Sequence, residues 1–513
     1  MNFARHFYLL TQVAAVLLSQ SAFAESTIET KSADLPSFTQ NADCLDFINE
    51  NPQRVSCGFI QLPVNHDDPA DGTITLPILI AGQTRSLTAT PSNKAILIPG
   101  GGGPGASIGF GLPYQSDEYL GVYSSLRSAG FDVVIMDQRG TGLAKPTLRC
   151  PETTTAFKRS ISEYQSFSDS LKTYRVSLND CRQRLKSENI SLQNFDTYQS
   201  AKDYLTVIEK LPYEWWGTLA TSYATVIAQE MEVLQPSLFN RIVLDSPVAI
   251  DYQRPFTFEL IESSIQRILS LCEITRRCNR RHEDIKTRFR EVVARFKQKS
   301  VSLNLDIYDA GVGVQQATLQ IDDKMLLDML ILAAYSNYTL TDIPWIIDGL
   351  HKGKTDRLKQ LATDYWHYNN DLDFASALSW VIHCKERQPM EEAYLRRHPS
   401  EFENYSAASQ IAFNQERLIC TDWHTKTTGN SVQSHIISTE TLILAGDLDP
   451  VIDRDDIKNT ADNFTNKQVK ILAGTGHSVW FQSACTRRNV VTFFSQNSSD
   501  EILDCTDGIS RFK

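Results

Sequence analysis

The distribution of apolar and polar residues along the chain predicts an α/β fold. Residues 59–64 and 73–81 alternate between apolar and polar positions and contain proline, as antiparallel edge strands do. Later apolar runs are short and nearly continuous, which is typical of strands buried on both faces of a parallel sheet. These runs lie at residues 95–98, 131–136, 213–221, 240–247, 440–446 and 468–473. An amphipathic helix predicted at 198–211 lies between two of them, so most of the sheet is expected to be parallel.

The alternation of strands and helices stops between about residues 250 and 435, where helical periodicity dominates. Helices are expected at Thr257–Leu271, His282–Lys297, Lys324–Tyr335 and Trp345–Leu361. We therefore predict a core formed by residues 25–250 and 436–513, with a mostly helical lid domain inserted at 251–435. The chain of 513 residues is long enough for a large domain with such an insertion.

The first residues have the features of a secretory signal peptide. Arg5 and His6 precede an apolar run at residues 7–18, and Ala22-Phe-Ala24 has the small-x-small pattern of a cleavage site. The run is too short to cross a bilayer, and no later stretch is long and apolar enough. Residues 1–24 are therefore excluded from the fold. The protein is expected to be exported, periplasmic or secreted, without stable membrane insertion.

All ten cysteines lie after this segment, and an even number of cysteines in an exported chain favours disulfides. Zinc binding is the alternative, but the sequence contains no Cys-x-x-Cys pair, so no metal is expected. Pairing of sequence neighbours would close five short loops. This predicts disulfides 44–57, 150–181, 272–278, 384–420 and 485–505.

Ser222 is the candidate nucleophile. It lies between the strand predicted at 213–221 and a helical pattern that follows it. This is the layout of a nucleophile elbow, in which a sharp turn lifts the serine oxygen above the sheet edge. The N–H groups at the start of the following helix point toward the same place, which suits a developing oxyanion. The alternative is a serine in an ordinary strand–helix junction.

A run of glycines, Pro99-Gly-Gly-Gly-Gly-Pro-Gly105, follows the strand predicted at 95–98. Its Gly-x-Gly-x-x-Gly spacing formally fits a dinucleotide-binding loop. However, Pro104 removes an N–H that a pyrophosphate needs, and Asp137 lies too far along the chain to contact a ribose. A flexible loop is another alternative. We favour a loop that offers backbone N–H groups to an oxyanion, and we expect no cofactor.

Asp449 and His477 follow the last two predicted strands. Catalytic loops of open parallel sheets lie at the carboxyl ends of the strands. The order Ser222, Asp449, His477 is also the order of α/β-hydrolase triads. Such a site needs a histidine to take the proton of the serine, and a buried carboxylate to fix the tautomer of that histidine. Asp447 competes with Asp449 for the second role.

Taken together, these motifs resemble the prolyl aminopeptidase family of α/β-hydrolases, and most closely its larger exported branch, the tripeptidyl aminopeptidase-like proteins. The resemblance rests on Gly102-Gly-Pro-Gly105, Asp137-Gln-Arg-Gly-Thr-Gly142, Thr221-Ser-Tyr223, Leu444-Ala-Gly-Asp-Leu-Asp-Pro450 and Gly476-His477. It implies an α/β-hydrolase fold with a helical lid. It also implies that Ser222 is the nucleophile, Asp449 the orienting acid and His477 the base, with the backbone N–H groups of Gly103 and Tyr223 forming the oxyanion hole.

The chain departs from the family pattern at four positions. Gly101 stands where many relatives have histidine, and Leu143 stands where serine is usual. Ala220 and Ala224 replace the two glycines of the elbow, so the turn is expected to be strained but usable. These differences bear on the substrate class and the catalytic efficiency more than on the fold.

Members of the family recognise a free amino terminus with acidic residues of the lid. Glu259, Glu262 and Glu386 are unranked candidates for this role, but we expect each of them to be a solvated helix charge. Arg139 follows the strand predicted at 131–136. It either pairs with a carboxylate under the active site or forms a structural ion pair that orders loops, and we favour the structural pair.

The sequence therefore predicts an exported serine exopeptidase that removes short units from peptides with a free N-terminus through an acyl-enzyme. An ester hydrolase on the same scaffold is one alternative, because triad chemistry acts on esters and amides alike. A non-catalytic binding protein with an inactive elbow is another. The formal net charge of −11 opposes electrostatic binding to nucleic acid, so no such partner is expected.

Overall fold

The computed structural model describes residues 39–40, 55–85, 92–108, 121–250, 257–309, 313–336, 338–371, 373–386, 400–423, 435–495, 504–505 and 512. The signal peptide predicted at residues 1–24 lies outside these ranges, and so does Cys44 of the predicted disulfide 44–57. Within the described ranges, no helix has the length and apolar character needed to span a membrane.

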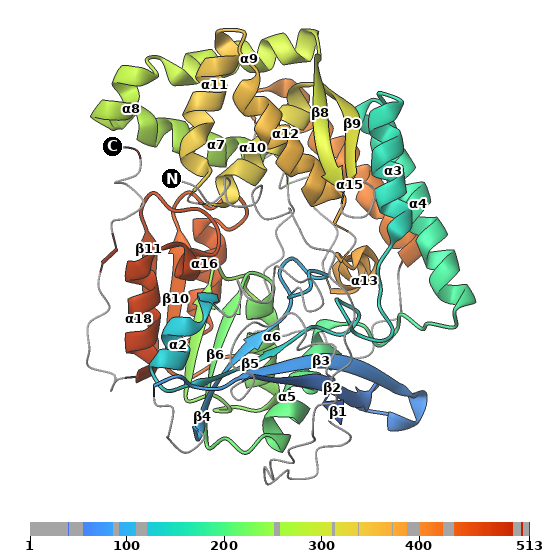
Figure 1. Ribbon diagram of the computed structural model, residues 1–513, viewed down its shortest axis with the longest axis vertical. Helices are drawn as coiled ribbons and strands as arrows, with labels where there is room; N and C mark the ends of the chain where they lie inside the picture. Colours follow the sequence, from blue (N-terminus) through green and yellow to red (C-terminus); the bar gives the residue numbers. More distant parts are fainter. Residues whose placement is uncertain are drawn as a thin grey trace, which may run out of the picture.

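Nine strands of the described chain form one sheet, which occupies the lower half of the molecule in Figure 1. The strands from β5 to β11 pair in parallel, in the order β5-β4-β6-β7-β10-β11. At one side, β1, β2 and β3 add an antiparallel edge. The bounds are β1 Thr39–Gln40, β2 Val55–Pro63, β3 Thr73–Ala81, β4 Lys94–Pro99, β5 Asp132–Met136, β6 Trp215–Thr221, β7 Arg241–Asp245, β10 Thr441–Gly446 and β11 Lys467–Leu472. The predicted α/β class, mostly parallel sheet and antiparallel edge strands are confirmed.

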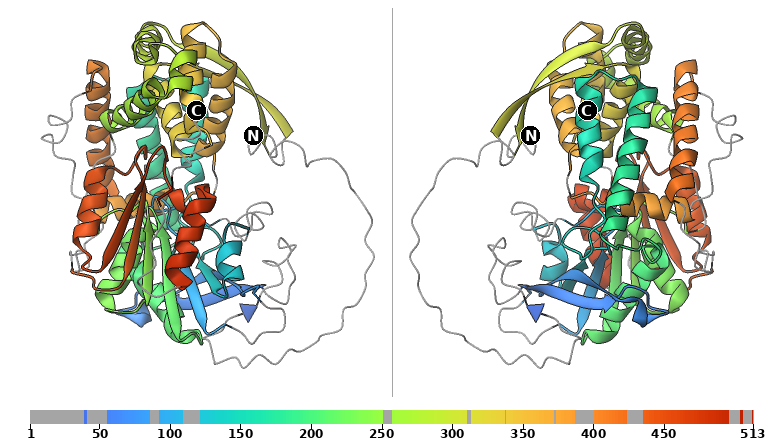
Figure 2. Two further views of the ribbon diagram at one scale, coloured as in Figure 1. Left: turned by 90° about the vertical axis from the view of Figure 1, so that its left-hand side faces the viewer. Right: turned by 90° about the vertical axis from the view of Figure 1, so that its right-hand side faces the viewer.

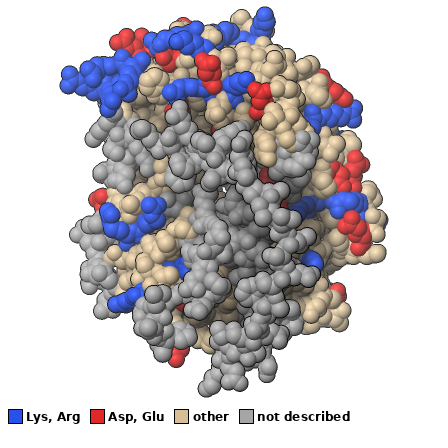
Figure 3. Space-filling model, viewed as in Figure 1, with Lys and Arg blue, Asp and Glu red and all other residues tan. Residues whose placement is uncertain are grey.

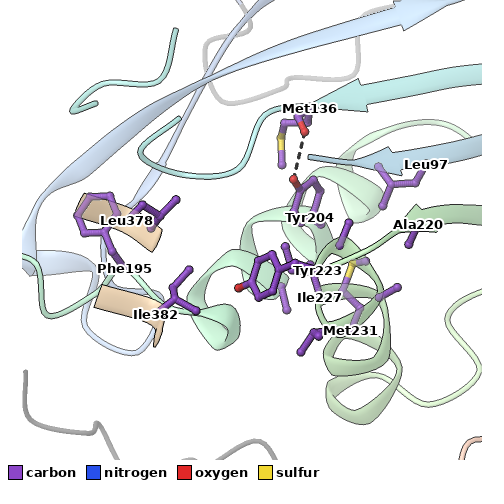
Figure 4. Close-up of a cluster of buried hydrophobic side chains, with 14 of the residues drawn as sticks. Leu97, Met136, Phe195, Tyr204, Ala220, Tyr223, Ile227, Met231, Leu378 and Ile382 are labelled. Atoms are coloured by element: carbon purple, nitrogen blue, oxygen red, sulfur yellow. Dashed lines mark hydrogen bonds between the residues drawn. The ribbon is translucent and has the colours of Figure 1, made fainter. Parts of the chain in front are cut away.

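Both faces of the sheet are buried, as the continuous apolar runs predict. Leu97 of β4 belongs to a cluster with residues of α5 (Thr197–Lys210) and α6 (Ala224–Leu234), part of which Figure 4 shows. The next residue, Ile98, belongs to a cluster on the opposite face, with α2 (Ser124–Ser128) and α18 (Ala484–Ser495). The remaining short helices beside the sheet are α16 (Arg454–Asp462) and α17 (Val479–Gln482).

A largely helical region with a hydrophobic cluster of its own lies above the sheet in Figures 1 and 2. Its helices are α7 Phe258–Ile274, α8 Arg276–Arg281, α9 Ile285–Gln298, α10 Asp323–Tyr335, α11 Ile343–His351, α12 Asp356–Asn369 and α15 Glu403–Trp423. From the preceding part of the chain, α3 (Pro151–Ser162) and α4 (Phe167–Ser187) pack against this region. In contrast, α13 (Ser376–Glu386) packs into the sheet cluster through Leu378 and Ile382 (Figure 4).

The inserted region also contains an antiparallel hairpin, which the helical patterns did not predict. Its strands are β8 (Val301–Asp309) and β9 (Gly313–Ile321). Leu303, Leu305 and Ile307 of β8 face the hydrophobic cluster, and the residues between them are exposed. This two-residue alternation is the periodicity of a half-buried strand rather than of a helix.

Four of the five predicted disulfides are confirmed: 150–181, 272–278, 384–420 and 485–505. Each joins cysteines that are neighbours among the ten in sequence, so each closes a short loop. The exposed arginines of α8 form a basic corner beside the 272–278 disulfide, visible at the upper left of Figure 3. Elsewhere on this face basic and acidic side chains are mixed. The expectation that the protein has no nucleic-acid partner remains a prediction.

Candidate active site

Ser222 occupies a strained turn at the carboxyl end of β6. Its φ angle is +58°, in the left-handed region that residues other than glycine rarely adopt. Its N–H donates to the carbonyl oxygen of Asp245 at 3.0 Å, and its own carbonyl oxygen accepts from the N–H of Thr225 at 2.9 Å. Strand, two-residue turn (Ser222 and Tyr223) and helix therefore follow in close succession, which is the backbone geometry of a nucleophile elbow.

Two backbone N–H groups, one beside this turn and one in the glycine loop, make no hydrogen bond within the described residues. The Tyr223 ring points into the core cluster toward Phe195 and Ile382 (Figure 4), and its hydroxyl forms a 2.6 Å hydrogen bond with the Thr197 hydroxyl. The N–H groups of Tyr223 and Gly103 have no acceptor within the described residues. Gly103 has a φ of +44°, and no atom lies within 4 Å of the position of a Cβ there. Both N–H groups thus remain available to an incoming oxygen atom.

His477 and Asp449 are joined by a hydrogen bond between Nδ1 and Oδ2 at 2.8 Å. Both side chains are buried. The other carboxylate oxygen of Asp449 accepts from the N–H groups of Val451 and Ile452, each at 2.9 Å. The competing carboxylate, Asp447, instead accepts from the N–H of Gly474 at 2.6 Å. Of the two candidates, Asp449 is therefore the one that contacts the imidazole.

The electrostatic environment favours a positive charge on His477. Burial lowers the pKa of the imidazole, but the charge and hydrogen bond of Asp449 more than offset this, so the pKa is raised above its ordinary value. The charge of Asp245 acts in the same direction. These carboxylates would therefore stabilise the imidazolium that forms when His477 accepts a proton.

Asp245 connects the turn of Ser222 to the loop of His477, and the sequence analysis did not identify this role. Its carbonyl oxygen accepts from the N–H of Ser222, while its carboxylate accepts from the N–H groups of Val479 at 2.9 Å and Trp480 at 3.0 Å. Burial raises the pKa of Asp245 to about 6, against the lowering effect of these two donors. One buried residue thus holds together two candidate site residues that are far apart in sequence.

Serines in the left-handed conformation cluster at this junction. Ser246 follows Asp245 at φ +51°, and Ser478 follows His477 at φ +59°. The N–H of Ser478 donates to the Ser246 hydroxyl at 2.8 Å. Together with Ser222, three non-glycine residues adopt this sparsely populated conformation where the candidate residues meet. Backbone strain of this kind concentrates at functional sites.

The inserted region supports each of the candidate loops. The N–H of His477 donates to the carbonyl oxygen of Tyr335, the last residue of α10, at 3.0 Å, and the two rings pack edge to face. Arg267 of α7 donates to the carbonyl oxygen of Asp449 at 3.0 Å. The glycine loop is held in the same way, because the N–H of Ala375 donates to the carbonyl oxygen of Gly105 at 2.8 Å.

Glycine is required where the loop after β10 meets the loop after β11. A Cβ on Gly446, at the end of β10, would lie 2.1 Å from the carbonyl oxygen of Gly476. A Cβ on Gly476 would lie 2.4 Å from the carbonyl oxygen of Ala334 in α10. Backbones can approach this closely only in the absence of a side chain. These contacts set the position of the loop that carries His477.

The three glutamates considered for amine recognition are engaged in structural contacts. Glu259 and Glu262 are buried, and they accept hydrogen bonds from Ser409 and Ser400, respectively. Glu386 accepts from the N–H of Thr197 at 2.6 Å, at the start of α5. The expectation that these residues are solvated helix charges is therefore wrong for Glu259 and Glu262. Burial raises the pKa of Glu386 to about 7.

Arg139 forms the structural ion pair that the sequence analysis favoured. It is fully buried and donates through Nε and Nη2 to both carboxylate oxygens of Asp203, at 2.8 and 2.7 Å. Its remaining nitrogen donates to the carbonyl oxygens of Val64 and Asn194. The guanidinium thus ties loops to α5, and the prediction is confirmed.

One group of side chains in the described residues has the proximity of metal ligands, namely Cys150, Glu152 and Cys181. The two sulfur atoms form the 150–181 disulfide, so neither is a thiolate that could bind a metal.

Comparison with known proteins agrees with the observed architecture. The sequence matches the family model of the alpha/beta hydrolase fold over residues 96–484. Comparison with curated protein sequences gives no match. Solved structures similar to this chain include a proline iminopeptidase of Mycobacterium smegmatis (11% identity, 85% of this chain and 97% of that chain covered, TM-score 0.36). They also include epoxide hydrolase A of Mycobacterium thermoresistibile (12% identity, 82% and 94% covered, TM-score 0.34). A likeness at this level assigns no activity, whereas the family model covers most of the chain. The protein belongs to the alpha/beta hydrolase fold family.

Proposed function

We propose that this protein is an exported serine hydrolase that removes short units from the N-termini of peptides through an acyl-enzyme. The observation that carries the proposal is the junction at Asp245. That residue binds the N–H of Ser222 on one side and the loop of His477 on the other, and His477 is in turn hydrogen-bonded to Asp449. A hydroxyl in a strained turn, an imidazole and a buried carboxylate together meet the requirements of nucleophilic catalysis by serine.

In this mechanism the Ser222 oxygen attacks the carbonyl carbon of the scissile bond, and Nε2 of His477 takes the hydroxyl proton. Asp449 keeps the remaining proton on Nδ1 and stabilises the imidazolium. The negative charge that develops on the carbonyl oxygen is stabilised by the free N–H groups of Gly103 and Tyr223. The leaving amine takes the proton from His477, and a water molecule then releases the acyl group by the same steps in reverse.

Ser222 and His477 share no hydrogen bond within the described residues. Catalytic hydrogen bonds of this type often tighten only when substrate is bound. The mechanism therefore needs the two side chains to approach each other in the substrate complex. The elements that hold them, the turn after β6 and the loop after β11, are already linked through Asp245.

The choice of a peptidase over other hydrolases rests on the resemblance of the motifs to exported tripeptidyl aminopeptidase-like proteins. Export is supported by the signal-peptide features of residues 1–24 and by the four disulfides of the described chain, because disulfides persist in oxidising compartments. Peptides with a free N-terminus are accordingly the proposed substrates.

The test combines one variant with a substrate screen. Ser222→Ala is expected to lower turnover by about 10⁴-fold or more, and to abolish labelling by a fluorophosphonate probe. Ser237→Ala is the matched control, because Ser237 also has a positive φ angle but is exposed in the loop that follows α6. Near-normal turnover in Ser222→Ala would end the proposal.

Chromogenic mono-, di- and tripeptides, each with a free and a capped amine, separate the alternatives. The proposed aminopeptidase hydrolyses only the free forms. An ester hydrolase ignores the cap and prefers ester substrates. An intact protein that neither reacts with the probe nor hydrolyses any substrate favours the non-catalytic binding protein.

A further inference from the structure

The basic corner formed by α8 carries four positive charges that the protein itself does not use. Arg276, Arg277, Arg280 and Arg281 are all exposed and lie within the six residues of this helix. Among the described residues, none of the four guanidinium groups forms an ion pair or a hydrogen bond. Other exposed basic side chains of the inserted region are paired, as Arg290 is with Glu401 at 3.1 Å. Guanidinium groups without a carboxylate partner are suited to bind phosphate, because their planar fork matches its oxygen atoms.

The acidic side chains nearest to α8 along the chain do not neutralise this corner. Glu273, which precedes α8, lies 3.4 Å from Lys286. Glu283 and Asp284, which follow α8, are exposed, and in the described part of the chain they form no ion pair with the arginines. They reduce the local positive charge, but the four arginines outnumber them. The net charge of −11 belongs to the whole chain, and charges more than about 10 Å away are largely screened at 0.1 M salt.

Two large apolar side chains are exposed beside the arginines. Ile274, the last residue of α7, is 81% exposed and precedes α8 by two residues. Trp345 of α11 is 39% exposed, and its ring lies 4.4 Å from that of His282, the residue that follows α8. The guanidinium of Arg281 lies 5.8 Å from the centre of the same indole. Single exposed apolar residues are common on protein surfaces, but aliphatic and indole side chains among basic residues are typical of surfaces that lie at a bilayer interface.

The corner is held in a fixed shape and lies at the outside of the molecule. The disulfide between Cys272 and Cys278 joins the end of α7 to α8, and both cysteines are buried in the hydrophobic cluster of the inserted region. Ile274 lies in the loop that this disulfide closes. Figures 1 and 3 show α8 at an outer corner, away from the sheet that carries the candidate active site. A surface that is already ordered loses little conformational entropy when it binds.

We propose that the basic corner binds the surface of a bilayer that contains anionic phospholipids. The arginines of α8 contact lipid phosphates, while Ile274 and Trp345 enter the interface between headgroups and acyl chains. The contact is a reversible adsorption, which agrees with the finding that none of the described helices can span a membrane. Membrane binding of this kind does not depend on the proposed hydrolase activity, and it would hold an exported protein at a membrane surface.

Vesicle cosedimentation with the full-length mature protein tests the proposal. Vesicles of phosphatidylcholine that contain about 30% phosphatidylglycerol are compared with vesicles of phosphatidylcholine alone. Binding to the anionic vesicles is expected to be at least about 10-fold tighter, and to weaken when NaCl is raised from about 0.1 M to about 0.5 M. No binding to the anionic vesicles, or equal binding to both kinds, would overturn the proposal.

A quadruple variant locates the binding surface. Replacement of all four arginines of α8 by glutamine is expected to lower the partition coefficient for anionic vesicles by about 100-fold or more. The matched control removes four positive charges from exposed positions of α3 and α4, which lie on the other side of the inserted region in Figure 1. Its substitutions are Lys158→Gln, Arg159→Gln, Lys172→Gln and Lys186→Gln. The control is expected to bind within a few fold of wild type, and an equal loss in both variants would refute the assignment to α8. Thermal melting checks that both variants are folded.

The apolar residues distinguish a membrane from a soluble polyanion. Ile274→Ser removes an exposed side chain without disturbing the fold, and it is expected to weaken vesicle binding by roughly 5-fold or more. Brominated phospholipids are expected to quench part of the tryptophan fluorescence of the wild type, and Trp345→Phe is expected to lose that part. Long-chain polyphosphate serves as the soluble probe. If polyphosphate binds as tightly as anionic vesicles and neither apolar substitution changes vesicle binding, the corner is a site for soluble polyanions and the membrane proposal is wrong.

Discussion

Replacement of Asp449 by asparagine is the sharpest test of the proposed catalytic group. The carboxylate oxygen Oδ1 of Asp449 accepts from two backbone N–H groups, those of Val451 and Ile452. In Asp449→Asn the amide oxygen must take this place, because an NH₂ group cannot accept from these donors. The NH₂ group then faces Nδ1 of His477, which must become an acceptor. The proton of the imidazole moves to Nε2, the atom that has to accept the proton of Ser222.

The expected effect is large because the wrong tautomer cannot act as a base. Loss of a correctly oriented base in a serine hydrolase costs about 10³- to 10⁴-fold in kcat. This corresponds to roughly 4 to 5.5 kcal/mol of activation free energy. Folding should be much less affected, since the shape of the side chain and both backbone hydrogen bonds are retained.

The assay is the rate of fluorophosphonate labelling together with kcat for whichever chromogenic substrate the wild type hydrolyses. Asp447→Asn is the control, because Asp447 is the neighbouring carboxylate of the same loop and bonds only to backbone of the loop before His477. Its amide oxygen still accepts from the N–H of Gly474, so kcat is expected to stay within a few fold of wild type. Urea unfolding of both variants checks that the fold is retained.

The reasoning would be refuted if Asp449→Asn kept more than about a tenth of the wild-type kcat. It would also be refuted if Asp447→Asn were the more damaging substitution. In the first case the hydrogen bond between His477 and Asp449 has no part in proton transfer. In the second case the acid has been misassigned.

Three further predictions concern pH, packing and disulfides. His477 must be neutral to accept a proton and its pKa is raised, so kcat/KM is expected to fall with decreasing pH at a midpoint above the ordinary value of 6.5, as a pH–rate profile will show. Gly446→Ala places a Cβ 2.1 Å from a carbonyl oxygen and is expected to lower the free energy of unfolding by about 3 kcal/mol. Gly349→Ala, whose Cβ has 3.6 Å of space, is the control in the same urea titration. Replacing both Cys150 and Cys181 by alanine opens a loop of 31 residues and should cost about 3 to 4 kcal/mol in that titration.

Much of the fold follows from local patterns that tertiary structure does not override. The continuous apolar runs became parallel strands buried on both faces, and the proline-containing alternating runs became the antiparallel edge. The disulfide pairs followed from sequence proximity, because short loops between cysteines bring their side chains together at little entropic cost. Hydrophobic patterns and cysteine spacing that are local in sequence were therefore enough to predict these features.

The hairpin β8–β9 was missed although its signal is present in the sequence. Leu303, Leu305 and Ile307 alternate with polar residues, but the helical patterns on both sides dominated the interpretation of this region. The role of Asp245 is a different case. Nothing local distinguishes an aspartate at the end of a strand, and its contacts come from a loop more than 230 residues further along the chain. Such a role emerges only when the strands are assembled.

The candidate site was predictable as a set of loops, because parallel strands end at one edge of a sheet. The surroundings of Glu259 and Glu262 were not predictable, since these residues face Ser409 of α15 and Ser400 just before α15 rather than solvent.

The supports of the three loops limit how this protein can evolve and be engineered. Tyr335, Arg267 and Ala375 each hold one loop through a hydrogen bond to its backbone, so these bonds do not depend on the side chains of the loops, whereas Gly446 and Gly476 must stay glycine because a Cβ there would clash. A minimal version of the protein, trimmed to the sheet and its flanking helices, would lack all three braces. The inserted region above the sheet therefore holds the candidate active site in place, and under the proposed function its exchange between homologues is expected to yield folded chimaeras without activity.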